Sequence, residues 1–326
     1  MINLIKAPIE KELENYEEFA RKAIRSEEPL LNSILDYVFE NKGKSLRPML
    51  VLLSAGMHSA SPAAGLGKRA YLAAMLIEMI HTASLIHDDV IDESDTRRGH
   101  PSVNARWKSR NAVLTGDYIL ARNMQAGLES GQYDLLTYVS RAMGELCEGE
   151  LSQSDHSARV EMTRRDYTDI IYKKTAVLIG SAAALGALAV GAGKEAVSRM
   201  RRFGDYLGMA FQIKDDILDY TGIDIGKPVG NDLREKKITL PLLALLEKCG
   251  PERREELTAL LRETDSRPEN VETLRRTVIE EGGIETARQV MQEYVQKAVA
   301  LLADYPHSHY RTSLATLCSY VAEREK

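Results

Sequence analysis

The sequence repeats one acidic pattern inside apolar helical segments, as Asp88-Asp89-Val90-Ile91-Asp92 and again as Asp215-Asp216-Ile217-Leu218-Asp219. Residues four apart lie on one face of a helix, so the outer aspartates of each stretch form a pair that we call the first and the second claw. A solvated acidic helix turn could show the same aspartate spacing. Apolar runs, Ala83 to Ile86 and Leu207 to Phe211, precede the two stretches and disfavour that interpretation. We expect the rest of the chain to hold the two claws face to face.

Carboxylates grouped in apolar surroundings require a cation. They repel one another and lose hydration, so a bound positive charge has to neutralise them. Mg²⁺ takes oxygen ligands and also binds phosphates, which predicts a magnesium site for a phosphorylated substrate. The predicted metal ligands are the aspartates of the two stretches: Asp88, Asp89, Asp92, Asp215, Asp216 and Asp219.

The composition indicates an all-helical protein. Of 326 residues only ten are proline and 6% are aromatic, and strong helix formers such as Ala, Leu, Glu and Lys are abundant. No Pro/Ser-rich linker, long charge block or repeat divides the chain, so we predict a single domain over residues 1–326. The net charge of −5 gives no electrostatic case for nucleic acid as a partner.

The cysteines and the N-terminus indicate a cytoplasmic protein. Cys147, Cys249 and Cys318 are odd in number and widely spaced, which fits neither a disulfide framework nor a zinc site. The first residues, with Lys6 and Glu10 among them, do not read as a signal peptide.

Basic turns lie before and after the first claw. Amphipathic helices are predicted over residues 8–25 and 29–40, and the turn at 41–48 then leads into an apolar helix from Met49 to Met57, so Lys44 and Arg47 can reach an anion near a helix start. Beyond the claw, Arg97-Arg98-Gly99-His100-Pro101 is a second basic turn, and guanidinium groups match phosphate oxygens. A lone basic turn is usually just solvated, so each of them alone is weak evidence.

The segment 65–93 carries the first claw and predicts a central buried helix, because it is apolar nearly all round from Tyr71 to Ile86. Glu78, His81 and His87 interrupt the apolar pattern. A single buried histidine is more often a hydrogen-bonded core residue than a ligand, but His81 lies two helical turns before Asp88 on nearly the same face.

The middle of the chain predicts further helices. Two of them, between Asn111 and Leu151, break around Ser130-Gly131, and Thr163 with Asp166 caps the next. The uncharged run from Ala176 to Gly193 is almost long enough to span a membrane. Its Ala and Gly content instead favours close packing of central helices.

The second claw lies in a predicted helix from about Lys194 to Tyr220, which Gly222 closes. The loop from Gly226 to Leu233 has two glycines and mixed charges, which predicts a mobile lid. From Pro241 to Lys326 the pattern predicts five or so shorter amphipathic helices without a site-like cluster, and we interpret this third as scaffold.

These motifs resemble those of the all-trans isoprenyl diphosphate synthases, the polyprenyl synthetases. Asp88-Asp89-x-x-Asp92 followed by Arg97-Arg98-Gly99-x-Pro101 is similar to their first aspartate-rich motif, and Phe211-Gln212-x-x-Asp215-Asp216-x-x-Asp219 is similar to their second. The resemblance runs from about Gly43 to Pro241. The family usually has two glycines before the lysine of its first basic loop, and here Lys42 replaces the first of them.

The resemblance implies a single all-α helical bundle with a central cavity and a Mg²⁺-dependent prenyltransferase. Two diphosphates would bind, an allylic one such as farnesyl or geranylgeranyl diphosphate and isopentenyl diphosphate. The allylic diphosphate would bind through Mg²⁺ to Asp88, Asp92 and Asp215, with Asp89, Asp216 and Asp219 completing or supporting the cluster. Its oxygens would contact Arg97, Lys174 and Lys227, and Lys237 is a further substrate-binding candidate.

Isopentenyl diphosphate would bind to Lys44, Arg47, His81 and Arg98. The implied reaction is ionisation of the allylic diphosphate, condensation and proton loss. Metal and cations stabilise the leaving diphosphate, and Thr175, Phe211 and Gln212 would line the carbocation site without water. The released diphosphate would take the proton, so we expect no protein general base.

The residues below the first claw predict a long product. Ala83 and Ser84 precede Asp88 by five and four residues and are small, whereas short-chain members of the family carry aromatic residues at one or both positions. An open channel toward Ile80 and Leu76 predicts about seven to ten isoprene units, as in heptaprenyl or octaprenyl diphosphate synthases, with the final floor unassigned. Small residues at these positions would also suit tight helix packing alone.

Three alternatives were weighed. A terpene cyclase usually replaces the second motif with an Asn/Ser/Glu pattern, and an HD phosphohydrolase, suggested by His87-Asp88, would leave the second claw unexplained. An inactive subunit of a two-component synthase would lose the claws, so in such a synthase this chain would be the catalytic half. A shorter-chain synthase stays open. As partners we expect a second copy of the chain in a homodimer and a transient membrane contact for product release, and the product would suit a quinone side chain.

Overall fold

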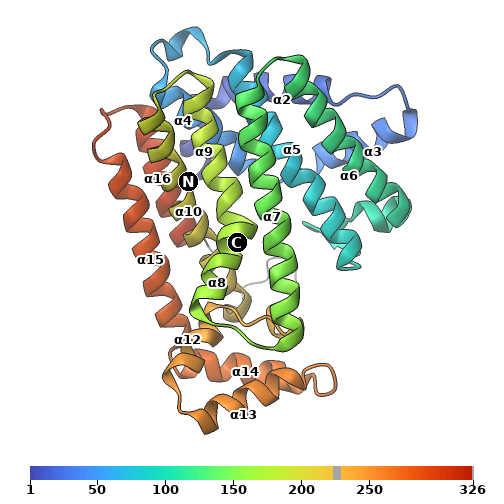
Figure 1. Ribbon diagram of the computed structural model, residues 1–326, viewed down its shortest axis with the longest axis vertical. Helices are drawn as coiled ribbons and strands as arrows, with labels where there is room; N and C mark the ends of the chain where they lie inside the picture. The colour runs from blue at the N-terminus through green and yellow to red at the C-terminus, as the bar shows by residue number, and fades with distance from the viewer. Residues whose placement is uncertain (223–228, 325–326) are drawn as a thin grey trace. The chain divides into compact units, whose positions relative to one another are not determined.

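The computed structural model describes residues 1–222 and 229–324. Nearly all of this described chain is helical, and its only strands are the two-residue β1 (Thr96–Arg97) and β2 (His100–Pro101) (Figure 1). The all-helical fold class predicted from the composition is therefore confirmed.

The chain divides into two compact units. The first unit consists of Met1–Met143, Leu178–Gly204 and Asp304–Leu317, and the second of Gly144–Val177, Asp205–Ala303 and Cys318–Lys326. Each claw belongs to one unit, since Asp88 and Asp92 lie in the first and Asp215 and Asp219 in the second. The single domain over 1–326 and the face-to-face arrangement of the claws stay predictions.

The N-terminal helices of the first unit follow the predicted ones closely. The segments predicted at 29–40 and 65–93 form α3 (Pro29–Glu40) and α5 (Gly67–Ile91). The helix expected from Met49 starts earlier, because Leu46, Arg47 and Pro48 already form the first turn of α4. The elements up to residue 129 are α1 (Ile2–Lys6), the 3₁₀ turn η1 (Ala7–Ile9), α2 (Glu10–Ala23), α3, α4 (Leu46–His58), the 3₁₀ turn η2 (Pro62–Ala64), α5, β1, β2 and α6 (Val103–Glu129).

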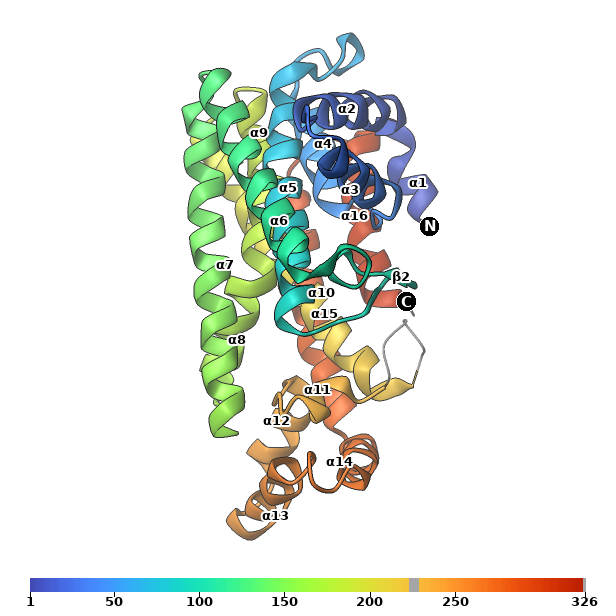
Figure 2. The ribbon, with the colours of Figure 1, turned by 90° about the vertical axis from the view of Figure 1, so that its right-hand side faces the viewer.

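Helix α5 is the centre of the first unit. Most of its side chains from Ala70 to Ile86 are buried, and α6, α4 and α2 pack around it. Figures 1 and 2 both show α5 and α6 side by side along much of their length. The predicted central buried helix is confirmed, and it places the first claw at its C-terminal end.

The uncharged run after Ala176 packs through its small residues, as predicted. A Cβ added at Gly186 would lie 2.2 Å from the Val51 carbonyl oxygen of α4, so only glycine permits this approach. Ser54 of α4 donates to the Ala183 carbonyl at 2.7 Å. By length and composition Gly67–Ile91 and Arg164–Ala189 are apolar enough to cross a membrane, but 61% and 83% of their apolar windows are buried, as in core helices.

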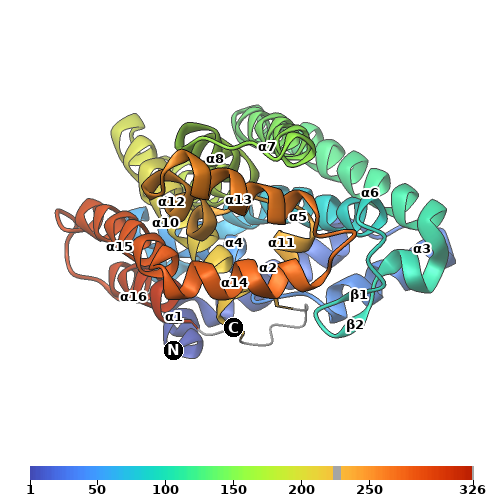
Figure 3. The ribbon, with the colours of Figure 1, turned by 90° about the horizontal axis from the view of Figure 1, so that it is seen from below.

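The remaining helices begin with α7 (Tyr133–Arg159), after the predicted break at Ser130-Gly131. The predicted cap of α8 is present, because Thr163 and Asp166 form a reciprocal capping box. In the second unit α12 packs on α15 and α13 on α14, and Figure 3 shows the latter pair side by side. The elements are α7, α8 (Arg164–Ile171), the π-helical turn η3 (Tyr172–Ala176), α9 (Val177–Ala189), α10 (Lys194–Thr221), α11 (Asn231–Arg234), α12 (Leu240–Lys248), α13 (Pro251–Arg262), α14 (Glu269–Glu280), α15 (Gly283–Leu302) and α16 (His309–Glu323).

Candidate functional site

The first claw stands where α5 ends. Asp92 is the residue that caps the helix, and its backbone N–H donates to the Asp88 carbonyl at 2.8 Å. This bond keeps the two aspartates one helical turn apart, as the spacing predicts. Asp88 is half-buried and Asp92 exposed, so the claw lies at the edge of the apolar helix and is accessible to a ligand.

Asp89 has a different environment from its two neighbours in the motif. It is buried, and both of its carboxylate oxygens accept from the Arg97 guanidinium at 2.7–2.8 Å. Nε donates to both oxygens and Nη2 lies 2.7 Å from Oδ1, so these charge-assisted contacts fix the orientation of Arg97 as well as that of the carboxylate. The geometry therefore favours a supporting role for Asp89, one of the two roles predicted for it.

The second basic turn is a tight hairpin. β1 pairs with β2 antiparallel, and the two residues between them, Arg98 and Gly99, have φ of 54° and 79°. Positive φ at both central residues is what a two-residue hairpin needs to match the twist of its strands. The turn places the Arg98 guanidinium against the first basic loop, where a Cβ on Gly43 would lie 2.7 Å from its Cζ atom. A side chain at Gly43, the glycine that this chain keeps, would displace the guanidinium from this position.

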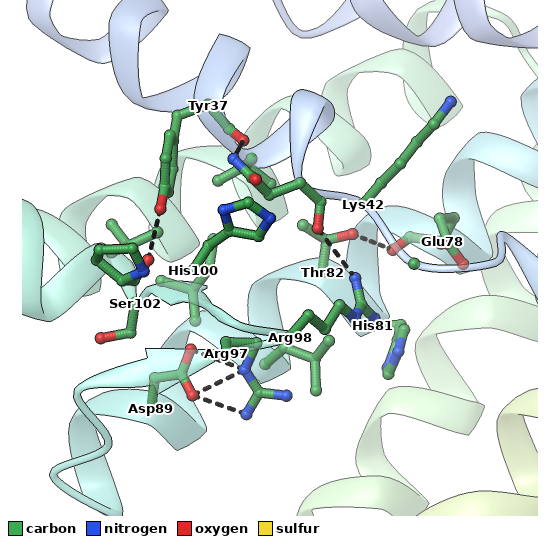
Figure 4. A pocket seen from close by; sticks show the side chains of 17 residues that line it. Tyr37, Lys42, Glu78, His81, Thr82, Asp89, Arg97, Arg98, His100 and Ser102 are labelled. Carbon is green, nitrogen blue, oxygen red and sulfur yellow. Dashed lines mark hydrogen bonds and ion pairs between the residues drawn. The ribbon is translucent and has the colours of Figure 1, made fainter. Parts of the chain in front are cut away.

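A cavity of about 80 Å³ lies between α3, the first basic loop, α5 and the hairpin. Figure 4 shows His81, Glu78 and Thr82 on the α5 side, with Arg97 and Arg98 opposite them on the hairpin. Arg98 donates to the Asn41 carbonyl at the long distance of 3.4 Å. Two residues predicted to bind isopentenyl diphosphate, His81 and Arg98, thus line one cavity.

The charges around this cavity are desolvated. Desolvation, then repulsion from Arg47, Arg98 and Arg97, holds the pKa of His81 well below its ordinary value. Burial likewise lowers the pKa of Arg47 and raises that of Glu78. The Arg47 Nε and the Glu78 Oε2 are buried without a hydrogen-bond partner in the described chain. Arg47, Arg98, His81 and Glu78 therefore form one electrostatic group.

The sequence alone assigned no role to Glu78, a member of this group, or to two residues near it, Lys42 and Tyr37. Glu78 stood out only as a polar interruption of the apolar helix, and Lys42 only as a departure from the family pattern. In the structure Lys42 forms an ion pair with Glu17 of α2, so its charge is tied to a neighbouring helix. Tyr37 fixes the hairpin by donating to the Pro101 carbonyl at 2.6 Å. Lys44 is exposed on the same loop.

The residues below the first claw have separate surroundings. Ala83, Ile80 and Leu76 are buried, and Ser84 is half-buried with its hydroxyl donating to the His81 carbonyl at 3.0 Å.

The ring of His87 is directed at α6, where its Nε2 lies 3.3 Å from the Val113 carbonyl oxygen and 3.6 Å from Asp117. His87 is thus held by α6, which does not support the HD phosphohydrolase alternative.

The second motif begins with a buried hydrogen-bond chain. The Thr175 hydroxyl donates to Gln212 at 2.6 Å, the Gln212 amide donates to Asp216 at 2.9 Å, and the Tyr167 hydroxyl donates to the other Asp216 oxygen at 2.6 Å. Burial raises the pKa of Asp216 to about 6, although both donors act to lower it. Thr175, Gln212 and Asp216 are brought together as predicted, and Tyr167 was not foreseen.

Asp219 organises the segment that follows α10. Its two oxygens accept the backbone N–H groups of Asn231 and Asp232 at 3.0 and 3.1 Å, at the start of α11. Asp232, which sequence reasoning missed, lies close enough to Asp216 and Asp219 for all three charges to interact, and desolvation followed by these neighbours raises its pKa. Three carboxyl groups are thus gathered at the end of α10 and the start of α11.

Lys174 and Lys237 line a cavity of about 90 Å³, together with Gln212, Asp216 and Asp232. Lys174 donates to Glu150 at 2.7 Å and to Gln153 at 2.5 Å. It stands on the π-helical turn η3, packed against Gly149, where a Cβ would lie 2.9 Å from the Lys174 backbone nitrogen. Lys237 contacts Glu235. Lys227 lies outside the described residues.

One expectation about the C-terminal third was wrong. We interpreted the segment after Pro241 as scaffold, but Arg324 reaches the second claw and forms an ion pair with Asp215 at 2.6 Å. The guanidinium also lies 3.9 Å from the centre of the Phe211 ring. The sequence carried no signal for this contact, because it depends on how α16 packs against α10.

The carboxylate pairs of the two claws suit Mg²⁺ that binds together with the substrate. No group of three or more His, Cys, Asp or Glu side chains in the described chain is placed to hold a metal ion by itself. Mg²⁺ is usually bound by one or two carboxylates together with waters and substrate phosphates, and a pair such as Asp88 and Asp92 matches that demand. The ion pair between Arg324 and Asp215 shows that the second claw, too, accepts a cation.

Comparison with known proteins identifies the family of this chain. The Polyprenyl synthetase family model matches residues 28–278. The chain belongs to the polyprenyl synthetase family. The resemblance predicted from the two aspartate-rich motifs is thereby confirmed, and the family match covers both of them.

Relatives in the polyprenyl synthetase family extend over most of the chain. Heptaprenyl diphosphate synthase component 2 of Bacillus subtilis (strain 168) is 37% identical over 97% of this chain and 87% of its own length. Octaprenyl diphosphate synthase of Escherichia coli (strain K12) is 35% identical over 93% of each. The structure of a decaprenyl diphosphate synthase from Rhodobacter capsulatus superposes with a TM-score of 0.91 at 31% identity over 100% of both chains. The fold is that of a polyprenyl synthase.

Proposed function

We propose that this polyprenyl synthetase is a Mg²⁺-dependent, long-chain all-trans polyprenyl diphosphate synthase. It joins an allylic diphosphate to successive isopentenyl diphosphates, with loss of one diphosphate and one proton in each cycle. The observation that carries the proposal is the pair of aspartate motifs. Each motif lies on a long helix, and its middle aspartate is held by another side chain, Asp89 by Arg97 and Asp216 by Tyr167. The names of the similar proteins support the same reaction class.

The first unit supplies the site for isopentenyl diphosphate. Arg47 and Arg98 are two cations beside His81, and diphosphate oxygens would satisfy donors such as the Arg47 Nε. His81 is neutral near pH 7 because its pKa is lowered, so it offers an N–H donor without adding charge. Glu78 offsets part of the repulsion among the cations.

The second unit supplies groups for ionisation of the allylic diphosphate. Asp215 in this unit, like Asp88 and Asp92 in the first unit, would hold Mg²⁺, which would neutralise charge on the leaving diphosphate. Asp216 and Asp219 are held by protein donors, so they support the ligands and add negative potential. Lys174 and Lys237 are placed around the cavity beside Asp216 and would contact diphosphate oxygens.

Protein dipoles near Asp216 favour a cationic intermediate. The Thr175–Gln212–Asp216 chain fixes the Gln212 carbonyl oxygen, and the Phe211 ring presents a face that already attracts a guanidinium. An allylic carbocation would be stabilised by the same aromatic face and by fixed dipoles that cost no reorganisation. The released diphosphate takes the proton, and no side chain is assigned as the general base.

A long product is proposed from helix α5. Ala83 and Ser84 leave the space below Asp88 free of aromatic side chains, and the similar proteins include heptaprenyl and octaprenyl diphosphate synthases. Each trans isoprene unit extends roughly 4–5 Å, so a channel from Asp88 to Leu76, ~18 Å along the helix, accommodates about four units beyond the site.

A homodimer and a membrane contact are part of the proposal. α6 exposes Leu114, Met124 and Leu128, whose spacing puts them on one side of the helix, a pattern that suits a second copy of the chain. The name of the Bacillus subtilis relative, component 2, favours a second candidate, in which this chain is the catalytic subunit of a two-component synthase. We place the protein in the cytoplasm, with transient membrane contact when the product leaves.

Incorporation of labelled isopentenyl diphosphate tests the proposed reaction. The purified chain alone, with farnesyl diphosphate and MgCl₂, should convert label into an extractable product, and EDTA should abolish the conversion. Conversion that appears only after a second protein is added would favour the two-component candidate. Absence of conversion with every allylic diphosphate and every divalent ion would contradict the proposed function.

A further inference from the structure

Arg324 belongs to the last described turn of the chain, and its side chain is only 9% exposed. One of its terminal nitrogens, Nη2, donates to the Asp215 carboxylate at 2.6 Å and to the Phe211 carbonyl at 3.0 Å. Its guanidinium carbon lies 3.9 Å from the centre of the Phe211 ring. All three groups belong to the second unit, and one arginine therefore engages two residues of the second motif.

Such a position requires a strong counter-ion. A guanidinium cannot lose its proton in proteins, so a nearly buried arginine is stable only when a carboxylate or an aromatic face compensates for lost water. Arg324 has both, in Asp215 and Phe211, while its Nε is buried without a hydrogen-bond partner in the described chain. The arrangement is stabilised mainly by Asp215.

The same two residues have proposed roles in the reaction. Asp215 is a proposed ligand of Mg²⁺, and the Phe211 ring is proposed to face the allylic carbocation. A divalent ion at Asp215 would stand beside the Arg324 cation, and like charges at such distances repel strongly in a partly buried site. Arg324 and Mg²⁺ therefore compete for one carboxylate.

We propose that Arg324 is an internal counter-ion of the second aspartate motif, which occupies Asp215 and covers Phe211 until Mg²⁺ displaces it. The inference rests on the proposed function, because it assumes that Asp215 binds the metal. Its consequence is that the resting chain binds Mg²⁺ more weakly than the aspartates alone would allow. The C-terminal turn is then a positioning element that couples metal binding to exposure of the Phe211 ring.

Binding of Mg²⁺ itself tests the competition without measuring turnover. We would titrate the full chain with MgCl₂ by calorimetry and with MnCl₂ by electron paramagnetic resonance, in wild type, Arg324→Gln and Arg324→Lys. Arg324→Gln should bind both ions roughly 5- to 30-fold more tightly than wild type, the factor that follows from ~1–2 kcal/mol of lost competition. Arg324→Lys keeps the charge without the planar stacking group, so it should fall between the two.

A matched control separates local competition from net charge. Arg276 is 70% exposed on α14, and Arg276→Gln removes the same charge from a side chain that touches neither motif. Its metal affinity should equal that of wild type. In an Asp215→Asn background the effect of Arg324→Gln should vanish, because the contested carboxylate is gone.

Two results would overturn the inference. If Arg324→Gln, folded by circular dichroism, binds Mg²⁺ and Mn²⁺ no more tightly than wild type, Arg324 does not compete for the site. If the tightening persists in Asp215→Asn, the arginine acts elsewhere. Failure of every variant to bind either ion, with and without inorganic diphosphate, would in addition contradict the metal assignment, and thus the proposed function together with this inference.

Discussion

Asp88 and Asp215 face the largest electrostatic demand in the proposed reaction, because the leaving diphosphate gains negative charge as its bond to carbon breaks. Each would hold Mg²⁺ at that charge, and pre-organised groups of this kind act mainly in the transition state. The neighbouring carboxylates are already fixed by the protein, Asp89 by Arg97 and Asp219 by two backbone N–H groups. Loss of a metal ligand should therefore affect turnover far more than the fold, although loss of Asp215 also removes the counter-ion of Arg324.

We predict that Asp88→Ala and Asp215→Ala each lower kcat by about 10³-fold or more, by analogy with the ~3–4 kcal/mol of one oxyanion donor. The measurement is steady-state kcat at saturating Mg²⁺, with circular dichroism as the check on folding. Asp95→Ala is the matched control, since Asp95 is exposed and lies just beyond the first motif. Near-normal kcat in either claw variant would rule out the metal assignment.

His81 should act on isopentenyl diphosphate as a neutral donor. Its pKa is held low by desolvation and by the neighbouring arginines, so the imidazole carries no charge at neutral pH. We predict that His81→Ala raises the KM for isopentenyl diphosphate roughly tenfold, the value of one hydrogen bond to a charged group, and raises that of the allylic primer less. His81→Gln keeps an N–H donor and should restore most of the affinity. Equal KM changes for both substrates would mean that the two diphosphate sites are wrongly divided.

At the scale of single residues, the sequence predicted which motif residues belong to the site better than it predicted which side chains contact them. Asp216 was found as part of the second aspartate stretch, and Gln212 from the family motif that this stretch resembles. Tyr167, Asp232 and Arg324 were not found, since each reaches the motif from another element and nothing in the local pattern marks it. Gly43 was noted as part of a basic loop, but the Arg98 guanidinium that lies against it comes from a hairpin more than fifty residues away.

Among the elements, α5 and α10 were predicted nearly to their ends, because long apolar patterns and a closing glycine leave few alternatives. The π-helical turn η3 was missed and read as ordinary helix. Its hydrogen-bond register depends on how Lys173 and Lys174 pack against Gly149 of α7, which is a tertiary contact.

The contact between α7 and η3 gives a prediction for one pair of variants. Gly149→Ala would place a Cβ 2.8 Å from that of Lys173 and 2.9 Å from the Lys174 nitrogen, so the turn must shift, at a cost of about 1–3 kcal/mol. Gly144→Ala on the same helix meets open space and should stabilise the helix by about 0.5–1 kcal/mol. The melting temperatures should therefore move in opposite directions, down for Gly149→Ala and up for Gly144→Ala. Equal melting temperatures would show that the approach is not tight.

Helix α5 carries the prediction on product length. Replacing Ala83 with Phe or Tyr puts an aromatic ring ~7.5 Å below Asp88 along the helix, on the path proposed for the growing chain. We predict an active enzyme whose products shorten to about three or four isoprene units. Mass spectrometry of the products decides between a channel and mere helix packing, because a folded, active variant with unchanged products would contradict the channel.

For the whole molecule, composition was enough to predict an all-helical protein, and the two motifs were enough to predict the family. Ala, Leu, Glu and Lys dominate a chain with few β-branched runs, and the described structure contains only the hairpin strands Thr96–Arg97 and His100–Pro101. The division into two compact units was not foreseen, because no linker composition marks it. Each unit carries one aspartate motif, and each motif contacts an arginine of its own unit, Arg97 in the first and Arg324 in the second.

The mass of the product made by the purified chain alone tests the proposed function most directly. The chain would be incubated with MgCl₂, isopentenyl diphosphate and farnesyl diphosphate, and the extracted polyprenyl diphosphates measured by mass spectrometry. A long-chain synthase with an open space below Asp88 predicts products of about seven to ten isoprene units, with none formed in EDTA. Products that stop at three or four units would contradict the long-chain assignment, and no condensation at all would contradict the prenyltransferase itself.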